Sequence, residues 1–170
     1  MYLSKMGTTT QQLQRWVDRH IPLRNRFMGI FAEDQLPTRV RGPCCMVLNY
    51  GKSTGDRIHG RLTFGMHWTA VVVDGNNHAE WIDSMGEAPD GDDYAWNIRT
   101  KFKMWLRATF RGYSYSPIRL QSYGSGVCGH YSVYACLVMG SVASRPDAYA
   151  WASQEYRRND QIIKGKVKIG

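Results

Sequence analysis

Cys128 combines a residue type and a position that suit nucleophilic chemistry. It follows the segment QSYGSGV and opens the apolar run CGHYSVYAC, which predicts that it begins a helix. Unpaired N–H groups and the dipole at a helix N-terminus stabilise negative charge, including that of a thiolate. The glycines just upstream let a substrate approach the backbone closely. The alternative is a buried core thiol, the common state of free cysteine, which fits Cys44, Cys45 and Cys136 well.

A thiol nucleophile needs a base, and the base needs a group that orients it. The segment HWTAVVVDGNNHAEWID predicts a hairpin over residues 67–74 and 78–83 with its turn at DGNN. In such a hairpin, His67 and Asp83 become cross-strand neighbours within reach of each other. The alternatives are a structural histidine and a carboxylate that caps a turn.

Gln121 lies seven residues before Cys128, at the end of an expected strand. A glutamine amide there could donate a hydrogen bond to an oxyanion that forms at Cys128. A glutamine at a strand end is ordinary by itself, so this role depends on the other three residues.

Taken together, GMHW, WIDSMG and LQSYGSGVCGHY resemble the adenovirus proteinase (adenain) family. That family belongs to a wider group of cysteine proteases that includes the SUMO-processing Ulp proteases. The stretches MGTTTQQLQRWV, RFMGIFAEDQLP and CCMVLNYG are also similar, so the resemblance is clearest over residues 6–140.

The resemblance implies a Cys128 nucleophile, a His67 base oriented by Asp83, a Gln121 oxyanion donor, and Trp68 packed beside the site. It implies a viral endopeptidase of the host-cell nucleus and virion that cleaves virion precursor proteins after glycine. The implied fold is a central mixed sheet flanked by helices, with the nucleophile at a helix N-terminus. Relatives of this kind use viral DNA and an activating viral peptide as cofactors.

Two features depart from that pattern. Asp83 stands where adenovirus enzymes often have Glu, so its shorter side chain must approach His67 more closely. Adenovirus enzymes also carry a cysteine upstream of the Gln that forms a disulfide with the activating peptide, whereas residues 105–120 contain no cysteine. This argues against a covalently attached peptide and leaves non-covalent activation, or none, open.

The formal net charge of +8 favours association with nucleic acid or acidic surfaces, although a solvated basic surface is the plain alternative. The candidate DNA contacts lie on one basic segment, in and just after an expected helix, and are Arg99, Lys101, Lys103, Arg107 and Arg111. The four cysteines have no C-x-x-C pair, so neither a metal site nor a disulfide scaffold is expected. No apolar run is long enough to span a bilayer, and we expect a soluble monomer without a signal peptide, made in a reducing compartment.

These residues must be positioned by one domain, since 170 residues suit a single core. A helix should begin near residues 8–10 at a capping box and end at Pro22. A loop with core anchors Phe27, Met28, Ile30 and Phe31 should follow, then a buried strand over 44–50 and a loop over 51–60. After the hairpin, we expect a helix over 94–110, a strand over 113–121 that Pro117 marks as an edge or a bend, a helix over 128–142, a helix after Pro146, and a weakly organised basic tail over 160–170. This order predicts a compact α+β domain.

Three other functions remain open at this stage. The same triad occurs in SUMO- and ubiquitin-type isopeptidases, and a similar one in acetyltransferases of bacterial effectors. A non-catalytic, DNA-packing virion protein on a protease-like fold is the third, although a fold alone would not require all four site residues. Thiol reactivity separates the third from the enzymes, and product analysis separates hydrolysis from acetyl transfer.

Overall fold

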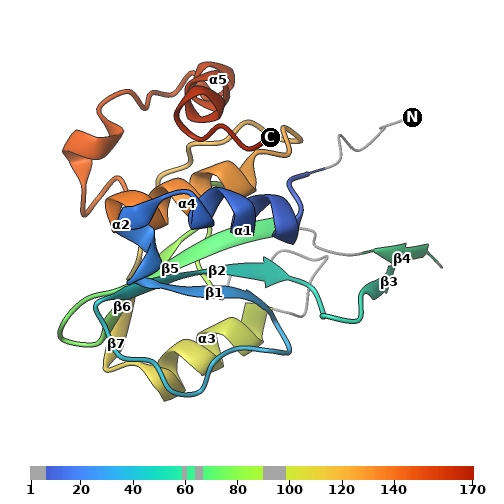
Figure 1. Ribbon diagram of the computed structural model, residues 1–170, viewed down its shortest axis with the longest axis vertical. Coiled ribbons are helices and arrows are strands. Elements are labelled where there is room, and N and C mark those ends of the chain that lie inside the picture. Colours follow the sequence, from blue (N-terminus) through green and yellow to red (C-terminus); the bar gives the residue numbers. More distant parts are fainter. Residues whose placement is uncertain (1–6, 59–60, 64–66, 90–98) are drawn as a thin grey trace.

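The computed structural model describes residues 7–58, 61–63, 67–89 and 99–170. At its centre lies a five-stranded mixed sheet in the order β1-β2-β5-β6-β7 (Figure 1). The strands are β1 (Phe27–Ala32), β2 (Cys44–Tyr50), β5 (His67–Val73), β6 (His78–Ile82) and β7 (Gly112–Tyr115). Two short strands, β3 (Asp56–Ile58) and β4 (Arg61–Thr63), form a separate antiparallel ribbon. The three central strands β2, β5 and β6 pair with one another in antiparallel fashion, while the edge strands β1 and β7 pair in parallel with β2 and β6.

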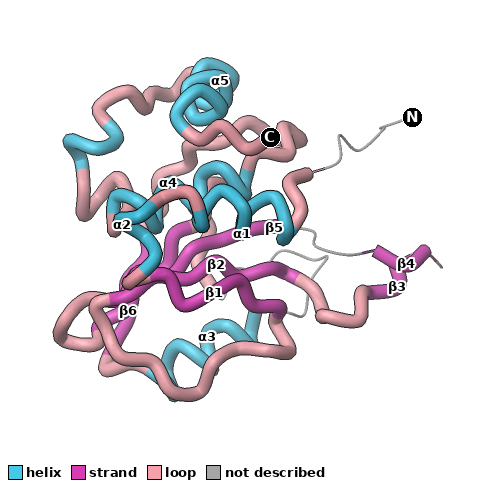
Figure 2. The backbone as a smooth tube through the Cα atoms, in the orientation of Figure 1, coloured by secondary structure: helices cyan, strands magenta, loops and turns pink. Residues whose placement is uncertain are grey.

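Helices cover both faces of this sheet. One face carries α1 (Thr10–Asp18), α2 (Ile21–Arg24) and α4 (Cys128–Val138), with α5 (Tyr156–Lys166) stacked outside α4, and the other carries α3 (Arg99–Thr109) (Figures 1 and 2). A short 3₁₀ helix spans Pro146–Tyr149. The domain is therefore an α+β domain with a mixed sheet between two helical layers.

The alternating direction of side chains along the central strands explains why helices cover both faces of the sheet. In β5, Trp68, Ala70 and Val72 belong to the core beneath α1 and α4. Val71 and Val73 belong instead to the core beneath α3. Since successive side chains of a strand point to opposite faces, the continuous apolar run of residues 70–73 needs a cover on both sides.

The predicted hairpin is present, and its register is well defined. Partners in the β5–β6 pair run from Val73 opposite Ala79 to Ala70 opposite Ile82. The ladder ends there, so Asp83 follows the last residue of β6 and lies diagonally across from His67 rather than directly opposite.

The predicted capping box of the first helix is also present. The Thr9 hydroxyl accepts from the Gln12 backbone N–H, and the Gln12 side chain accepts from the Thr9 backbone N–H. The helix ends at Asp18, however, before Pro22. Pro22 lies in the first turn of α2, where the missing N–H of proline costs no intrahelical hydrogen bond.

Several expected boundaries were wrong. Residues 27–32 form the edge strand β1 rather than a loop, and residues 56–58 of the expected second loop form β3. The expected strand over 113–121 ends at Tyr115, just before Ser116 and Pro117, and it is indeed an edge strand. α4 ends at Val138, where Met139 takes a left-handed conformation with φ of 55°. Helix α3 is described from Arg99 onward, and the earlier part of its expected range, 94–98, lies outside the described residues.

The expected basic tail over residues 160–170 was the largest error. Helix α5 runs through most of it, and Ile163 and Val167 are completely buried against the core. The C-terminal segment is thus an integral part of the domain. In the described part of the chain, no helix combines the length and apolar character that crossing a membrane requires.

Candidate active site

His67 and Asp83 meet at one end of the β5–β6 hairpin. His67 begins β5 and Asp83 directly follows β6. The His67 Nε2 atom lies 2.9 Å from Asp83 Oδ1. The side chain of His67 is 19% exposed, whereas that of Asp83 is almost completely buried. The sequence prediction that these two side chains lie within reach of each other is confirmed.

Asp83 accepts hydrogen bonds at both of its carboxylate oxygens. Besides His67, its Oδ2 accepts from the hydroxyl of Tyr50 at 3.1 Å, and its Oδ1 accepts from the backbone N–H of Met85 at 2.8 Å. Tyr50 is buried, and its ring lies 5.2 Å from that of Phe102 on α3. Helix α3 therefore supports the carboxylate from the opposite face of the sheet.

The ionisation of the pair follows from this environment. Burial raises the pKa of Asp83, but the charge and hydrogen bond of His67 and the donors on Met85 and Tyr50 outweigh it, so the pKa lies below its ordinary value. Burial lowers the pKa of His67, but Asp83 and the Cys128 thiol outweigh that effect and hold it well above its ordinary value. The geometry thus favours an imidazolium paired with a carboxylate.

Cys128 is the first residue of α4, as predicted, and it is 7% exposed. Its thiol interacts with the His67 ring, and this contact contributes to the raised pKa of that histidine. Since Nε2 of His67 is engaged by Asp83, Nδ1 is the ring nitrogen left for the sulfur. The first hydrogen bonds of α4 run from the backbone N–H groups of His130 and Tyr131 to the Val127 carbonyl, so the N–H groups of Cys128 and Gly129 are placed as donors beside the thiol. Cys128, His67 and Asp83 therefore form one connected row.

Gln121 lies at the base of the loop that leads to Cys128, and it is 5% exposed. Its Oε1 accepts from the Ser84 hydroxyl at 2.6 Å, and its Nε2 donates to the Ser125 hydroxyl at 3.0 Å. These contacts fix which end of the amide faces the loop of Cys128. An amide nitrogen has two N–H groups, so one remains for a further acceptor.

The turn after Asp83 packs against the chain segment that carries Gln121. The Ser84 carbonyl accepts from the backbone N–H groups of Leu120 and Gln121, at 2.8 and 3.0 Å. Gly86 has a φ of 74°, and a Cβ there would lie only 2.6 Å from the Pro117 carbonyl oxygen. The chain beside Asp83 therefore packs directly on the chain that carries Gln121, and this close approach requires glycine.

Trp68 is buried beside His67, and its indole N–H donates to the Thr8 carbonyl at 2.9 Å. Thr8 also packs near Gly129 on α4, where an added Cβ would lie 3.1 Å from the Thr8 side chain. Trp68 thus lies beside the site, as expected, and ties the chain before α1 to it.

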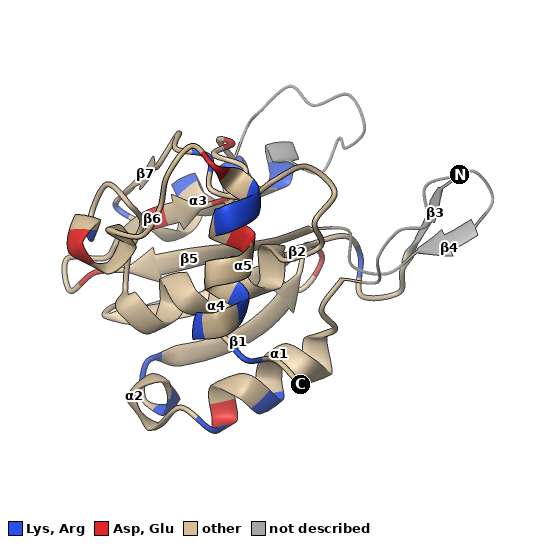
Figure 3. Ribbon diagram, turned by 90° about the horizontal axis from the view of Figure 1, so that it is seen from above, with Lys and Arg blue, Asp and Glu red and all other residues tan. Residues whose placement is uncertain are grey.

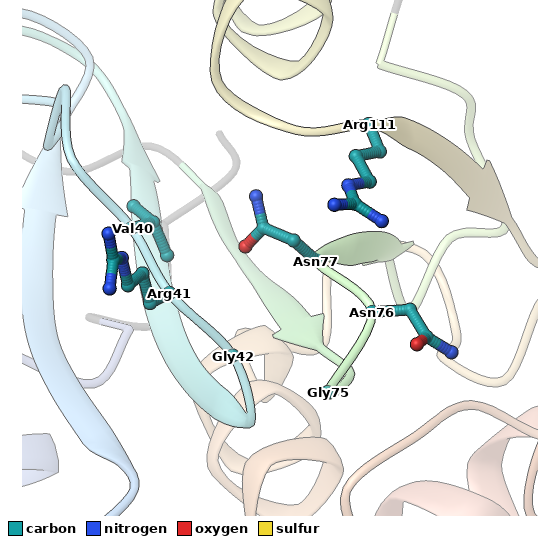
Figure 4. Close-up of a pocket in the computed structure, with 7 residues that line it drawn as sticks. All are labelled: Val40, Arg41, Gly42, Gly75, Asn76, Asn77 and Arg111. Carbon is teal, nitrogen blue, oxygen red and sulfur yellow. The ribbon is translucent and has the colours of Figure 1, made fainter.

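Two cavities differ in their relation to this site. One of about 220 Å³ is lined by Trp68, by residues of β1, by Asn49 of β2 and by Gly51 just after β2. The other, of about 430 Å³, lies at the turn of the β5–β6 hairpin, and its lining residues are Val40, Arg41, Gly42, Gly75, Asn76, Asn77 and Arg111 (Figure 4). The length of β5, roughly 20 Å at the usual rise per residue, separates this larger cavity from His67.

The expected DNA contacts are not gathered at the site. Helix α3 lies on the face of the sheet opposite α4, and lysines and arginines also occur on α1, α2 and α5 (Figure 3). Lys101 lies 3.8 Å from Glu33, and Arg107 and Arg111 are exposed. The side chain of Arg99 lies outside the described part.

The four cysteines are unpaired, and among the described residues no group of three or more His, Cys, Asp or Glu side chains could hold a metal ion.

Tyr50, Ser84 and Ser125 were missed from the sequence. Tyr50 ends a buried strand and looks like any core aromatic there, while a serine next to a turn is common. The one available signal was position, because Ser84 directly follows Asp83 and Ser125 lies within the GSG stretch.

No protein-family model matches this sequence, and a search of curated proteins finds no match. The resemblance to adenain therefore rests on the motifs themselves.

Proposed function

We propose that this protein is a cysteine endopeptidase that uses Cys128, His67 and Asp83, with Gln121 as an oxyanion donor. The observation that carries the proposal is the connected row of thiol, imidazole and carboxylate at the N-terminus of α4. A structural histidine would need only one buried partner, whereas His67 bridges a carboxylate and a thiol that come from different parts of the chain.

The proposed reaction begins when the Cys128 sulfur attacks the carbonyl carbon of a peptide bond. His67 holds the proton given up by the Cys128 thiol, and Asp83 stabilises this imidazolium. The oxyanion accepts hydrogen bonds from the unpartnered backbone N–H at the start of α4 and from the Gln121 amide. His67 then protonates the leaving amine as the C–N bond breaks, which leaves a thioester on Cys128.

Water completes the cycle. His67 accepts a proton from the water molecule as its oxygen attacks the thioester carbonyl, and the sulfur leaves as a thiolate beside the imidazolium. The products are a carboxylic acid and an amine, and the triad returns to its starting state. Neither half of the cycle needs a metal ion or an organic cofactor.

The likeness to adenain supports finer features of the proposal. The substrates would be virion precursor proteins cleaved after glycine, and the enzyme would act in the host-cell nucleus and the virion. Duplex DNA would stimulate it through its basic surface, with α3 as the candidate contact, and any viral peptide activator would bind without a disulfide. The net charge of +8 and the absence of cysteine over residues 105–120 support these last two features.

The direct test is hydrolysis of a fluorogenic peptide that ends in Gly-Gly, measured with and without duplex DNA. We expect hydrolysis by the wild type, none by Cys128→Ala, and full activity in Cys44→Ala, which removes a buried thiol from the opposite core. Hydrolysis that persists in Cys128→Ala would overturn the proposal. Faster hydrolysis with DNA would support the DNA-stimulated form, and an unchanged rate would remove that part.

A further inference from the structure

Helix α5 contacts the chain on both sides of Gln121. The residues on its inner face follow helical spacing and are Tyr156, Asn159, Asp160, Ile163 and Val167. The last two are apolar and fill the core, as expected for a covering helix. Asn159 and Asp160, however, are polar and 0% and 5% exposed. Burial of two polar side chains requires partners, and their partners flank Gln121.

Asn159 holds the residue before Gln121. Its Nδ2 donates to the Leu120 carbonyl at 3.1 Å and to the Ser153 carbonyl at 2.7 Å, while its Oδ1 accepts from the Ser153 N–H at 3.0 Å. Both N–H groups and the oxygen of this amide therefore bond to backbone groups. That pattern fixes the path of a chain segment rather than binding a ligand.

Asp160 holds the residue after Gln121. Its Oδ2 accepts from both the backbone N–H and the hydroxyl of Ser122, and its Oδ1 accepts from the Tyr131 hydroxyl at 3.0 Å. Tyr131 lies on α4, one turn after Cys128. A single carboxyl group thus joins the segment of Gln121 to the helix that carries the thiol.

A third contact acts on Gln121 itself. The Arg119 Nε donates to the Gln121 carbonyl at 2.8 Å. The guanidinium carbon of Arg119 lies 3.6 Å from the ring centre of Tyr123 and 4.2 Å from that of Tyr156 on α5. The helix therefore contributes to all three positions, Leu120, Gln121 and Ser122.

We infer that Asp160 and Asn159 are positioning residues that hold the Gln121 amide in register with Cys128. This inference rests on the proposed function, and it assigns the C-terminal helix a part in the reaction that the sequence pattern gave no reason to expect. Neither residue contacts the substrate. Their effect reaches the transition state through Gln121, whose donor is needed only when the oxyanion forms.

The kinetic test uses Asp160→Ala, with Arg158→Ala on the exposed face of α5 as the matched control. We expect Asp160→Ala to lower kcat about 10-fold or more with KM within about twofold, because an oxyanion donor acts in the transition state. In a Gln121→Ala background, the same substitution should cost less than about twofold more, since coupled residues are not additive. Independent losses that multiply in the double variant would overturn the inference.

Two further variants separate positioning from folding. Ser122→Ala removes one donor to Asp160 from the other side of the contact and should show the same kcat effect in a milder form. Asp160→Asn keeps an oxygen acceptor for Ser122, while Tyr131 can turn its hydroxyl to Leu120, 3.2 Å away. It should therefore recover most of kcat. A role through hydrogen bonding would be contradicted if Ser122→Ala left kcat unchanged and Asp160→Asn lowered kcat as much as Asp160→Ala does.

A readout without turnover keeps the inference distinct from the proposed function. The side-chain amide signals of Gln121 in an NMR spectrum, assigned by their loss in Gln121→Ala, report its environment directly. We expect them to shift or broaden in Asp160→Ala and to stay in place in Arg158→Ala. If the wild type hydrolyses no peptide, the proposed function fails, and these signals alone decide whether α5 positions Gln121. Unchanged signals in Asp160→Ala would overturn the inference.

Discussion

The imidazole of His67 lies between two partners, with its Nε2 atom 2.9 Å from Asp83 Oδ1 and its other side toward the thiol of Cys128. Asp83 is 3% exposed, so water does not compete for this contact. A carboxylate in such a place needs its donors, and a histidine that bridges two groups has its tautomer and its orientation fixed by them. The predictions below follow from these relationships.

The pH dependence of stability should reflect the ion pair. Because the pKa of Asp83 is lowered, its contribution is present above the ordinary carboxyl value of 3.8 and is lost as pH falls through the folded-state value. Because the pKa of His67 is raised, its contribution is full below the ordinary value of 6.5 and is lost as pH rises through the folded-state value. The difference in unfolding free energy between the wild type and Asp83→Asn should therefore be largest between about pH 4 and 6.5. Denaturant titrations across pH measure it, and a difference that grows above pH 8 would contradict this assignment.

Tyr50→Phe should weaken the support of Asp83 without creating a cavity. The variant removes a hydroxyl that donates to Asp83 Oδ2 at 3.1 Å and leaves the ring in place. Loss of a hydrogen bond to a buried charged group should cost about 1.5 to 3 kcal/mol of unfolding free energy. The pKa of Asp83 should rise, which NMR titration of that carboxyl detects. Tyr113→Phe on the edge strand β7 is the control, and an equal loss of stability there would contradict a specific role for Tyr50.

Ser84→Ala should impair Gln121 more than it impairs the fold. Its hydroxyl donates to Gln121 Oε1 at 2.6 Å, so the variant frees the amide to rotate. We expect kcat to fall about 10-fold with little change in KM, compared with roughly 10² to 10³ for Gln121→Ala. Steady-state kinetics on the Gly-Gly peptide measure both constants. A rise in KM with an unchanged kcat would instead point to substrate binding.

Gly86→Ala should destabilise the domain through the turn between Asp83 and the segment before Gln121. The left-handed φ of 74° alone should cost about 1 to 3 kcal/mol, and the approach of a Cβ to the Pro117 carbonyl adds to that. Gly75→Ala is the matched control because a Cβ there would meet nothing within 4 Å. Thermal unfolding compares the two variants, and equal melting temperatures would show that the turn can relax.

The positions of His67, Asp83 and Cys128 could be predicted from the sequence because they depend on local patterns. Spacing around the DGNN turn placed His67 beside Asp83, and a GSG stretch before an apolar run placed Cys128 at a helix start. The structure differs from the predicted register in one respect. The strand pairing stops at Ala70 and Ile82, so the side chains of His67 and Asp83 meet diagonally. Roles in hydrolysis and in DNA binding remain predictions.

The parts that could not be predicted depend on distant contacts. Strand β1 exists because Phe27–Ala32 pairs in parallel with β2, a relationship that leaves no turn signal in the sequence. Helix α5 escaped notice because polar Asn159 and Asp160 occupy its buried face, which hides its apolar periodicity. Two of the partners that satisfy them, Leu120 and Ser122, lie nearly forty residues earlier in the chain.

The central claim is that Cys128 is a nucleophile made reactive by His67. The most direct measurement is the rate at which a peptide ending in a glycine vinyl sulfone modifies the protein, with the modified residue identified by mass spectrometry. The account predicts a single adduct on Cys128 that forms at least about 100-fold more slowly in His67→Ala, as expected when a general base is removed. An adduct on Cys44, Cys45 or Cys136, or an equal rate on Cys128 without His67, would contradict it.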